Sequence, residues 1–195
     1  EQMKDSPITI NWISEPDKGI YNAMNKGIGH LGDSEYCLFL NSGDWLVIGR
    51  ENKSHYTENI IYFDATIVKD KISKITYSDE LSMRSFLYGF TLNHQNELIK
   101  TSLQKNCLYN ETLKILADNE FNIKNIFINK VSVRHSKNTL SYFDARDGIS
   151  SVNHDLFKEE QEKVRLEKER KNAERAARAK EVEEAQNVVA EAMKD

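Results

Sequence analysis

The chain lacks several features that would place it in a common class at once. Its 195 residues include only two cysteines, Cys37 and Cys107, and neither belongs to a Cys-x-x-Cys motif or to a cysteine and histidine cluster. This pattern argues against a structural zinc site and a disulfide framework, and it fits a reducing, cytoplasmic compartment. No run approaches the roughly 18 apolar residues that a transmembrane helix requires.

An excess of positive charge is also missing. The chain carries 27 Lys and Arg against 31 Asp and Glu, which gives a formal net charge of -4. A protein that binds nucleic acid through phosphate contacts normally presents a basic surface. We therefore expect no nucleic-acid partner. The length suits one ordinary domain with a core of useful size.

The first part of the chain has the pattern of alternating strands and helices. Residues 8–13 are β-rich and predict a strand, and residues 14–19 predict a loop by their Pro, Asp and Gly content. Residues 20–28 have the apolar spacing of a helix, and residues 35–40 form an apolar run typical of a strand buried on both faces. Together they predict a strand–helix–strand unit with a right-handed crossover.

The next hundred residues continue the mixed pattern. A strand is predicted over 59–68 with a hairpin partner over 72–77, then a helix over 112–127 and a last strand over 129–135. The order predicts an α/β domain built on a mixed sheet. Four apolar positions of the predicted helix are core candidates: Leu113, Leu116, Phe121 and Ile123.

The composition changes at about residue 155, which divides the chain into a domain over 1–155 and a charged tail over 156–195. The tail contains neither Gly nor Pro and predicts one long helix. A solvated helix is our interpretation, because clean heptads with large apolar residues are absent. Oligomerisation through a coiled coil, or peripheral membrane association, is the alternative suggested by a thin apolar stripe of Val182, Ala185, Val189 and Ala192.

Two polar loops follow the first two predicted strands, over 14–19 and 41–44. In open α/β sheets, ligands bind beyond the carboxyl ends of the strands. Carboxylates there suit Mg²⁺ or Mn²⁺ bridging a diphosphate. Spacing alone favours a plain turn at 41–44, since each residue is a turn former.

Residues 12–28, Trp-Ile-Ser-Glu-Pro-Asp-Lys-Gly-Ile-Tyr-Asn-Ala-Met-Asn-Lys-Gly-Ile, resemble a signature of bacterial family 2 glycosyltransferases of the GT-A fold, with Asn22 where relatives carry Asp. Residues 39–44, Phe-Leu-Asn-Ser-Gly-Asp, are similar to the segment that stands where other members carry an Asp-x-Asp metal motif. The resemblance implies that Asp44 is the ligand of Mg²⁺ or Mn²⁺. It implies a nucleotide-sugar site formed by Glu15, Asp17, Lys18, Asn25, Asn41 and Ser42.

The resemblance continues downstream. Residues 91–95 are similar to the family's His-Gln segment and place His94 and Gln95 on the acceptor side, although a lone histidine is more often a surface or core residue. Residues 116–121 resemble the family's acidic motif, which makes Asp118 the general base, the alternative being a helix-surface Asp. Asp147 replaces a Gly in a segment that resembles the loop after the catalytic domain.

The resemblance implies an inverting enzyme that moves a sugar from a nucleotide-diphosphate donor to a hydroxyl of a saccharide or lipid-linked saccharide. A carboxylate would take the proton of the acceptor hydroxyl, and the metal would neutralise the departing diphosphate. Surface-polysaccharide biosynthesis at the inner face of the membrane is the family-level expectation.

Relatives begin with a further strand–helix–strand portion of about 30 residues or more, which contacts the nucleoside. Residues 1–7 are too short to supply it, so we expect an N-terminally incomplete GT-A sheet followed by a long C-terminal helix. The competing hypothesis is a noncatalytic remnant or interaction protein that keeps the scaffold and binds partners through the tail.

Overall fold

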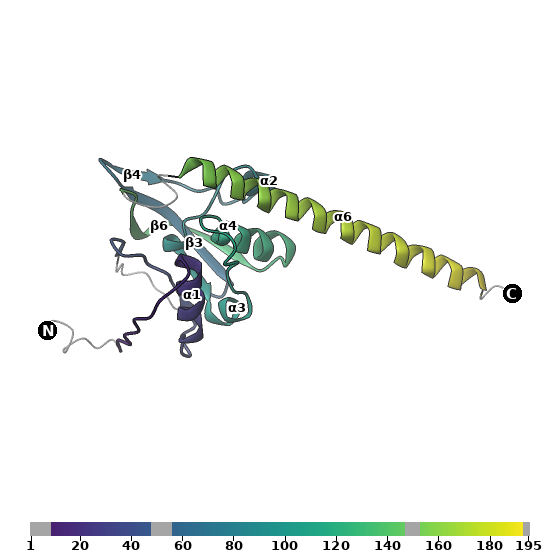
Figure 1. Cartoon of the computed structure of the whole chain (residues 1–195), viewed down its shortest axis with the longest axis horizontal. Helices are drawn as coiled ribbons and strands as arrows, with labels where there is room; N and C mark the ends of the chain where they lie inside the picture. The colour runs from purple at the N-terminus through teal and green to yellow at the C-terminus, as the bar shows by residue number, and fades with distance from the viewer. Residues whose placement is uncertain (1–8, 48–55, 147–152, 193–195) are drawn as a thin grey trace.

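A curled mixed sheet carries helices on one side, and a single long helix extends away from this body (Figure 1). The computed structural model describes residues 9–47, 56–146 and 153–192, with side chains of the last helix described to residue 186. The strands are β1 (Tyr36–Cys37), β2 (Trp45–Leu46), β3 (Ile60–Val68), β4 (Ile72–Ile75), β5 (Glu97–Lys100) and β6 (Val133–Asp144). The α-helices are α1 (Ile20–Gly29), α2 (Met83–Leu87), α3 (Thr101–Asn106), α4 (Ala117–Asn122) and α6 (His154–Ala192). A 3-10 turn, η2 (His94–Asn96), and a π-helical turn, η3 (Ile123–Ile128), complete the described elements.

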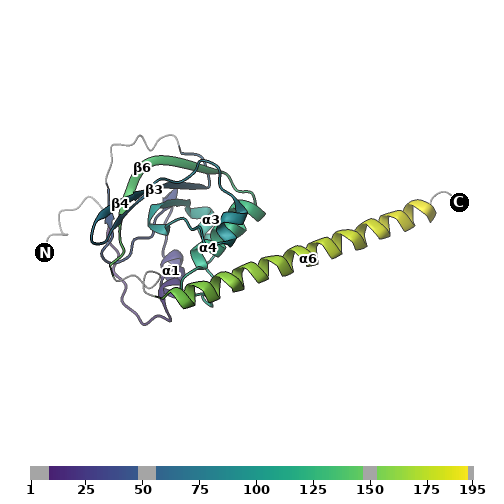
Figure 2. The same ribbon diagram turned by 90° about the horizontal axis from the view of Figure 1, so that it is seen from above.

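Strand β3 is the centre of the sheet. The strand order is β1-β5-β3-β6-β2, and β4 also pairs with β3. Strand β3 runs parallel to β6 and antiparallel to β5 and β4. Its residues from Ile60 to Thr66 are buried, as a strand covered on both faces requires. The strand predicted over 59–68 and its hairpin partner are therefore confirmed, and Figure 2 shows α1, α3 and α4 gathered on one side of the curled sheet.

The strand predicted over 8–13 is wrong over its described part. Residues 9–13 have no regular structure and are exposed, with Trp12 86% accessible, whereas Ile8 lies outside the described residues. The second predicted strand shrinks to β1, which pairs antiparallel with β5. A β-rich segment becomes a strand only when a partner takes its hydrogen bonds, and residues 9–13 find none in the described chain. The parallel pair of the sheet is β3 with β6 instead.

The core lies between the sheet and the helices. The helix predicted over 20–28 is confirmed as α1, and its buried residues are Tyr21, Met24 and Ile28. All four core candidates of the predicted 112–127 helix are buried, although α4 begins only at Ala117. Strand β6 begins later than the predicted 129–135 strand and continues to Asp144.

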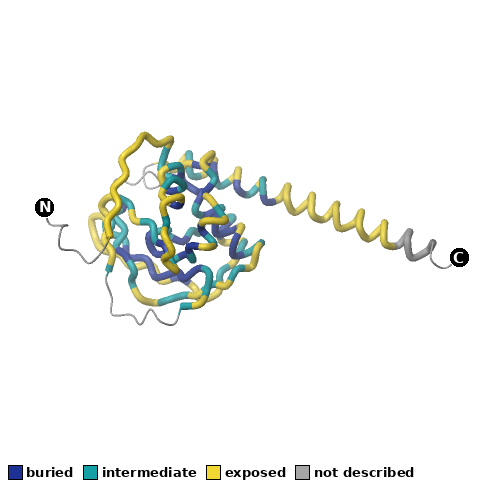
Figure 3. Tube along the Cα trace, turned by 90° about the horizontal axis from the view of Figure 1, so that it is seen from below, coloured by how far each residue is buried: buried dark blue, intermediate teal, exposed yellow. Residues whose placement is uncertain are grey.

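Helix α6 is the predicted long helix and has two distinct halves. Glu160, Val164 and Lys168, one turn apart on one face, are buried against the body, where α6 packs on α2. From 171 to 186 every side chain is exposed, as Figure 3 shows, and Val182 of the predicted apolar stripe is 51% accessible. Val189 and Ala192 lie outside the described side chains.

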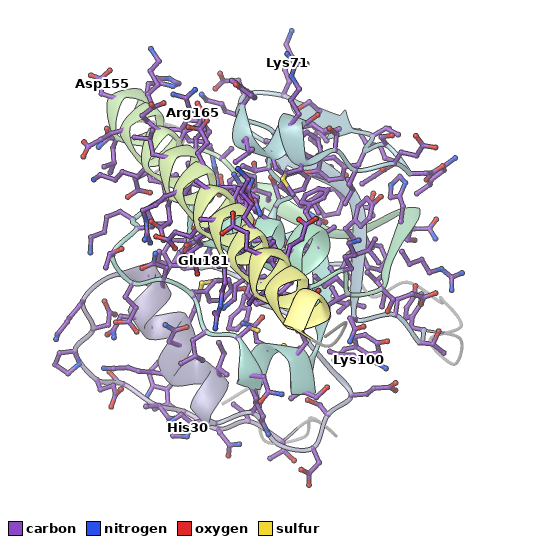
Figure 4. All side chains as sticks on the ribbon, turned by 90° about the vertical axis from the view of Figure 1, so that its right-hand side faces the viewer. His30, Lys71, Lys100, Asp155, Arg165 and Glu181 are labelled. Atoms are coloured by element: carbon purple, nitrogen blue, oxygen red, sulfur yellow. The ribbon has the colours of Figure 1, made fainter. Side chains whose placement is uncertain are left out.

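Ion pairs along its own surface stabilise α6 where the body does not cover it. Arg170 contacts Glu167 and Glu174, at 2.8 and 2.6 Å, and Lys171 lies 3.1 Å from Glu167. Opposite charges at this spacing are neighbours on the helix surface and stabilise it modestly. Figure 4 shows α6 in front of the body, with Arg165 and Glu181 labelled along it. Across the described ranges, no helix combines the length and apolar character needed to cross a membrane.

Candidate functional site

Four of the predicted site residues meet at one cavity. Asn41, His94, Gln95 and Asp118 line a space of about 150 Å³, although they come from three separate parts of the chain. Asn41 lies in the turn before β2, His94 and Gln95 form η2, and Asp118 lies in the first turn of α4. The fold therefore brings together the predicted base, the predicted acceptor-side residues and one predicted donor-side residue.

A chain of polar contacts connects Asp118, His94 and Asn41. The Nδ1 atom of His94 lies 3.1 Å from Oδ2 of Asp118, and its Nε2 atom lies 3.2 Å from Nδ2 of Asn41. An amide nitrogen can only donate, so Nε2 accepts from Asn41. The ring proton is then on Nδ1, which donates to the carboxylate of Asp118. His94 is held at both nitrogens and cannot rotate freely.

The second oxygen of Asp118 is held from the other side. Oδ1 accepts the backbone N–H of Asn119 at 2.8 Å and lies 3.2 Å from the hydroxyl of Tyr21. The same hydroxyl donates to the carbonyl oxygen of Ile115 at 2.6 Å. Burial, and next the charge of Asp118, raise the pKa of Tyr21 well above its ordinary value, so the hydroxyl stays a donor. The Asp118 carboxylate is thus fixed in orientation and still has acceptor capacity.

Asp44 closes the turn that presents Asn41 to the cavity. Its Oδ2 atom accepts the N–H of Asn41 at 2.9 Å, and its Oδ1 atom accepts the N–H of Asp144 in β6 at 3.0 Å. Gly43 has a φ of 95°, which a residue with a side chain rarely adopts, so glycine permits the turn. The turn interpretation of residues 41–44 is therefore confirmed, and Ser42 is exposed within it.

The carboxylate of Asp44 is suited to act as a single ligand of a divalent cation. About two of the four acceptor directions of a carboxylate are taken by backbone N–H groups, which leaves one on each oxygen. Asp144 is a neighbouring acid, but the guanidinium of Arg146 holds its carboxylate and lowers the pKa of Asp144 to about 2. No group of three or more His, Cys, Asp or Glu that could hold a metal occurs among the residues the structure describes.

The remaining predicted donor residues lie apart from this cavity. Glu15 forms an ion pair with Lys26 at 2.9 Å, which lowers the pKa of Glu15, and Asp17 accepts the backbone N–H of Gly19 at 2.9 Å. Glu15 and Asp17 line a second hollow of about 340 Å³ between the loop and α1. The backbone N–H of Lys18 donates to the side chain of Asn22 at 3.1 Å, which fastens the loop to the first turn of α1.

Asn25 has a structural contact that accounts for its position. Its side chain donates to the carbonyl oxygen of Tyr109 and accepts the N–H of Tyr109, both at 2.9 Å. Asn25 and Asn22 also donate to Glu111, and these two bonds lower the pKa of Glu111. An Asp at position 22, as in the glycosyltransferase signature, would repel Glu111, so the amide is the better partner here.

Two buried glutamates lie near the cavity, and no sequence motif identified them. Glu97, in β5, is fully buried and accepts the side-chain N–H of Asn122 at 2.9 and 3.2 Å. Burial, and next the charge of Asp118, raise the pKa of Glu97 to about 8. Glu160, in α6, is 2% accessible and accepts backbone N–H groups from the segment before α4. Neither lies in a motif, and their partners are far away in the chain, so no local pattern marks them.

A second polar cluster lies on the sheet around His135. Its ring nitrogens lie 2.9 Å from Asp64 and 2.6 Å from Asp79, and its ring stacks on Tyr62 with 4.8 Å between centroids. Burial opposes ionisation of Asp64, but His135, the N–H of Tyr77 and Lys74 together lower its pKa. Both ring nitrogens already face carboxylates, so this cluster holds β3, β4 and β6 together.

No protein-family model matches this chain, and no curated protein matches its sequence. The functional interpretation therefore depends on the residues and their geometry.

Proposed function

We propose that the chain is a glycosyltransferase of the inverting type and that the cavity around Asp118 is the acceptor side of its site. The observation that carries the proposal is the polar chain from Asn41 through His94 to Asp118, with contacts of 3.2 and 3.1 Å. Asn41 and His94 are 53 positions apart in sequence, and His94 and Asp118 are 24 positions apart. The family resemblance assigned each of the three to the site from a different motif. Their meeting at one cavity supports that assignment.

In this proposal Asp118 is the general base. The acceptor hydroxyl gives its proton to the Asp118 carboxylate while its oxygen forms a bond to the anomeric carbon of the donor sugar. The bond from that carbon to the diphosphate breaks, and the diphosphate leaves with the electron pair. One displacement on the opposite face inverts the configuration. His94 holds Oδ2 of Asp118, so the free lone pair points in a constant direction.

The cavity has room for a sugar-sized group only. Its volume of about 150 Å³ is below the roughly 300–1,000 Å³ of pockets that enclose drug-sized ligands. In this proposal the donor's nucleotide lies outside the cavity, along the exposed loop with Glu15, Asp17 and Lys18. Asp44 would supply one carboxylate ligand to Mg²⁺ or Mn²⁺. The ion would neutralise charge on the departing diphosphate.

In the same proposal the domain has the GT-A fold. A mixed sheet with a long C-terminal helix is compatible with part of a GT-A domain. The acceptor would be a saccharide or lipid-linked saccharide used in surface-polysaccharide biosynthesis, at the inner face of a membrane. This part rests on analogy with the family.

The test is a donor screen with a base variant. The chain is incubated with nucleotide-diphosphate sugars and saccharide acceptors, with and without Mn²⁺, and products are measured by mass spectrometry. Asp118→Asn should lower transfer by about 10²–10⁴-fold, because the amide cannot accept the proton in the same way. Glu120→Gln, two positions along α4, is the matched control and should transfer normally. Equal turnover by Asp118→Asn and the wild type would remove the base assignment.

A noncatalytic scaffold is the second candidate. It is favoured by the fact that Glu15 and Asn25, two predicted donor residues, are engaged in contacts within the protein. Calorimetric titration of the wild type with the same donors and Mn²⁺ separates the two. A scaffold would bind none of them, whereas a transferase would bind its donor.

A further inference from the structure

We propose that helix α6 is part of the site and that its Glu160 is the positioning residue for Asp118. The catalytic consequence rests on the proposed function, but the mechanical link between α6 and Asp118 does not. The charged tail that the sequence separates from the domain would then be required, in its first turns, for the geometry of the cavity.

Glu160 holds the segment that leads into α4. Its Oε1 atom accepts the backbone N–H of Lys114 at 2.5 Å, and its Oε2 atom accepts those of Ile115 at 2.8 Å and Leu116 at 3.0 Å. Helix α4 has no side-chain cap from its own N-cap residue, Leu116. Hydrogen bonds to a carboxylate are roughly twice as strong as neutral ones. Glu160 therefore fixes three consecutive peptides just before the turn that carries Asp118.

The peptide group of Ile115 passes this constraint to the cavity. Its N–H is bound by Glu160, and its carbonyl oxygen accepts the hydroxyl of Tyr21 at 2.6 Å. The single proton of that hydroxyl is shared between this carbonyl oxygen and Oδ1 of Asp118, which lies 3.2 Å from the hydroxyl oxygen. The other oxygen of Asp118, Oδ2, contacts His94. An unbroken series of polar contacts thus runs from α6 to the reacting carboxylate.

Helix α6 also forms part of the cavity itself. Phe157, almost one turn before Glu160, lines the same space as Asp118. Val164 and Lys168 extend the buried stripe beyond Glu160, so the docked part of α6 covers 157 to 168. A buried carboxylate is costly unless its partners are present, so α6 docks well only when residues 114–116 adopt this arrangement. Docking of α6 and order at Asp118 are therefore coupled.

The test uses the full chain without any donor, so it does not depend on the transferase proposal. Glu160→Gln replaces a charged acceptor by an amide whose NH₂ group faces backbone donors. Amide hydrogen exchange of residues 114–116 should accelerate by roughly tenfold or more, while β3 keeps its protection. Glu159→Gln is the matched control, because Glu159 is exposed and forms an ion pair with Lys163 on the surface of α6. It should leave exchange at 114–116 unchanged.

The chemical-shift response of the cavity is the second measurement. Glu160→Gln should shift the ring signals of His94 and the carboxyl signal of Asp118, which a purely global loss of stability would not do in the folded state. Tyr21→Phe removes only the hydroxyl in the middle of the link. It should shift the same two signals while residues 114–116 stay protected by Glu160.

When a donor is known, the steady-state kinetics of sugar transfer are the third measurement. Glu160→Gln should lower kcat by roughly tenfold or more and leave the KM for the donor near the wild-type value, since Glu160 acts on the base and not on donor contacts. Glu160→Gln could shift the signals of His94 and Asp118 and still leave the rate of sugar transfer unchanged. That result would preserve the structural link from Glu160 to Asp118 and refute the assignment of Asp118 as base.

Unchanged exchange at 114–116 in Glu160→Gln would overturn the inference. If that variant does not fold, amide hydrogen exchange of the wild type still tests the inference. Residues 114–116 and the amides of α6 from 157 to 164 should open with the same free energy, because they are one coupled unit. Faster opening of 114–116 than of docked α6 would mean that Glu160 does not hold them.

Discussion

His94 donates from Nδ1 to Oδ2 of Asp118 at 3.1 Å, and both side chains are about one-tenth accessible. Residues in direct contact do not contribute independently, so the pair should behave as one unit. We predict that His94→Gln lowers transfer by roughly tenfold or more, and that adding it to Asp118→Asn costs little further. Single-turnover rates of the two variants and their combination measure this. Multiplicative losses would show that the contact has no role in the reaction.

Glu97 makes the stability of the protein depend on pH. Burial raises its pKa from an ordinary value of 4.5 to about 8, so the folded state binds more protons than the unfolded state between these values. The free energy of unfolding should therefore fall as the pH rises from about 4.5 to about 8, by a few kcal/mol in all. Glu97→Gln keeps an acceptor for Asn122 and should remove this dependence.

Denaturant unfolding of both proteins at a series of pH values measures the effect. The stability difference in favour of Glu97→Gln should be smallest at the acid end and grow with pH, then level off above about 8. A difference that does not vary with pH would contradict the raised pKa of Glu97.

Gly43 is required by the backbone of the turn that holds Asn41 and Asp44. Its φ of 95° disfavours any side chain, and an added Cβ would lie 3.4 Å from the carboxylate of Asp144. We predict that Gly43→Ala lowers the free energy of unfolding by about 1–3 kcal/mol. Gly32→Ala is the control, since a Cβ there meets nothing within 4 Å and φ is not in the positive range. Equal stabilities of the two variants would refute the strained turn.

Metal dependence should reside in Asp44. Removal of divalent cations with a chelator should lower transfer by the wild type, and added Mn²⁺ should restore it. In Asp44→Asn the response to Mn²⁺ should be weakened or lost, because the amide is a poor ligand. Transfer rates measured against Mn²⁺ concentration give the result. A full Mn²⁺ response in Asp44→Asn would place the ion elsewhere.

The two halves of α6 should respond differently to the same substitution. Val164 is 7% accessible and Val182 is 51% accessible. Val164→Ala should destabilise the protein by about 1–2 kcal/mol through loss of buried methyl groups. Val182→Ala should change stability by about 0.5 kcal/mol or less. Thermal unfolding of the two variants compares them, and equal effects would contradict the docking of the first half alone.

Local pattern was enough for the elements whose stability is local. The apolar run of β3 predicts a buried strand, and the absence of Gly and Pro after residue 155 predicts one helix. The core positions of the 112–127 segment follow from helical spacing even though α4 begins late. Residues 9–13 have equal β character and form no strand, because strand formation depends on a partner that spacing cannot reveal.

The candidate site likewise contains some residues that sequence motifs identified and others that only the fold revealed. Motif resemblance named Asn41, His94 and Asp118, and the fold places them at one cavity. It gave no hint of Glu97 or Glu160, whose roles come from burial and from partners 25 and 44–46 positions away. The donor residues on the 14–19 loop are separated from the cavity by the path of that loop, which the sequence does not specify.

What the sequence determined by itself is therefore the set of reactive residue types and the elements that carry them. Helical periodicity, an apolar run and turn-forming residues act over a few positions, so they can be recognised without a fold. Only the tertiary structure decided which carboxylate accepts hydrogen bonds from which backbone N–H groups. Hydrogen bonds such as those of Glu160 to Lys114, Ile115 and Leu116 join segments that the chain keeps far apart. Their strength depends on burial, which exists only after the chain has packed.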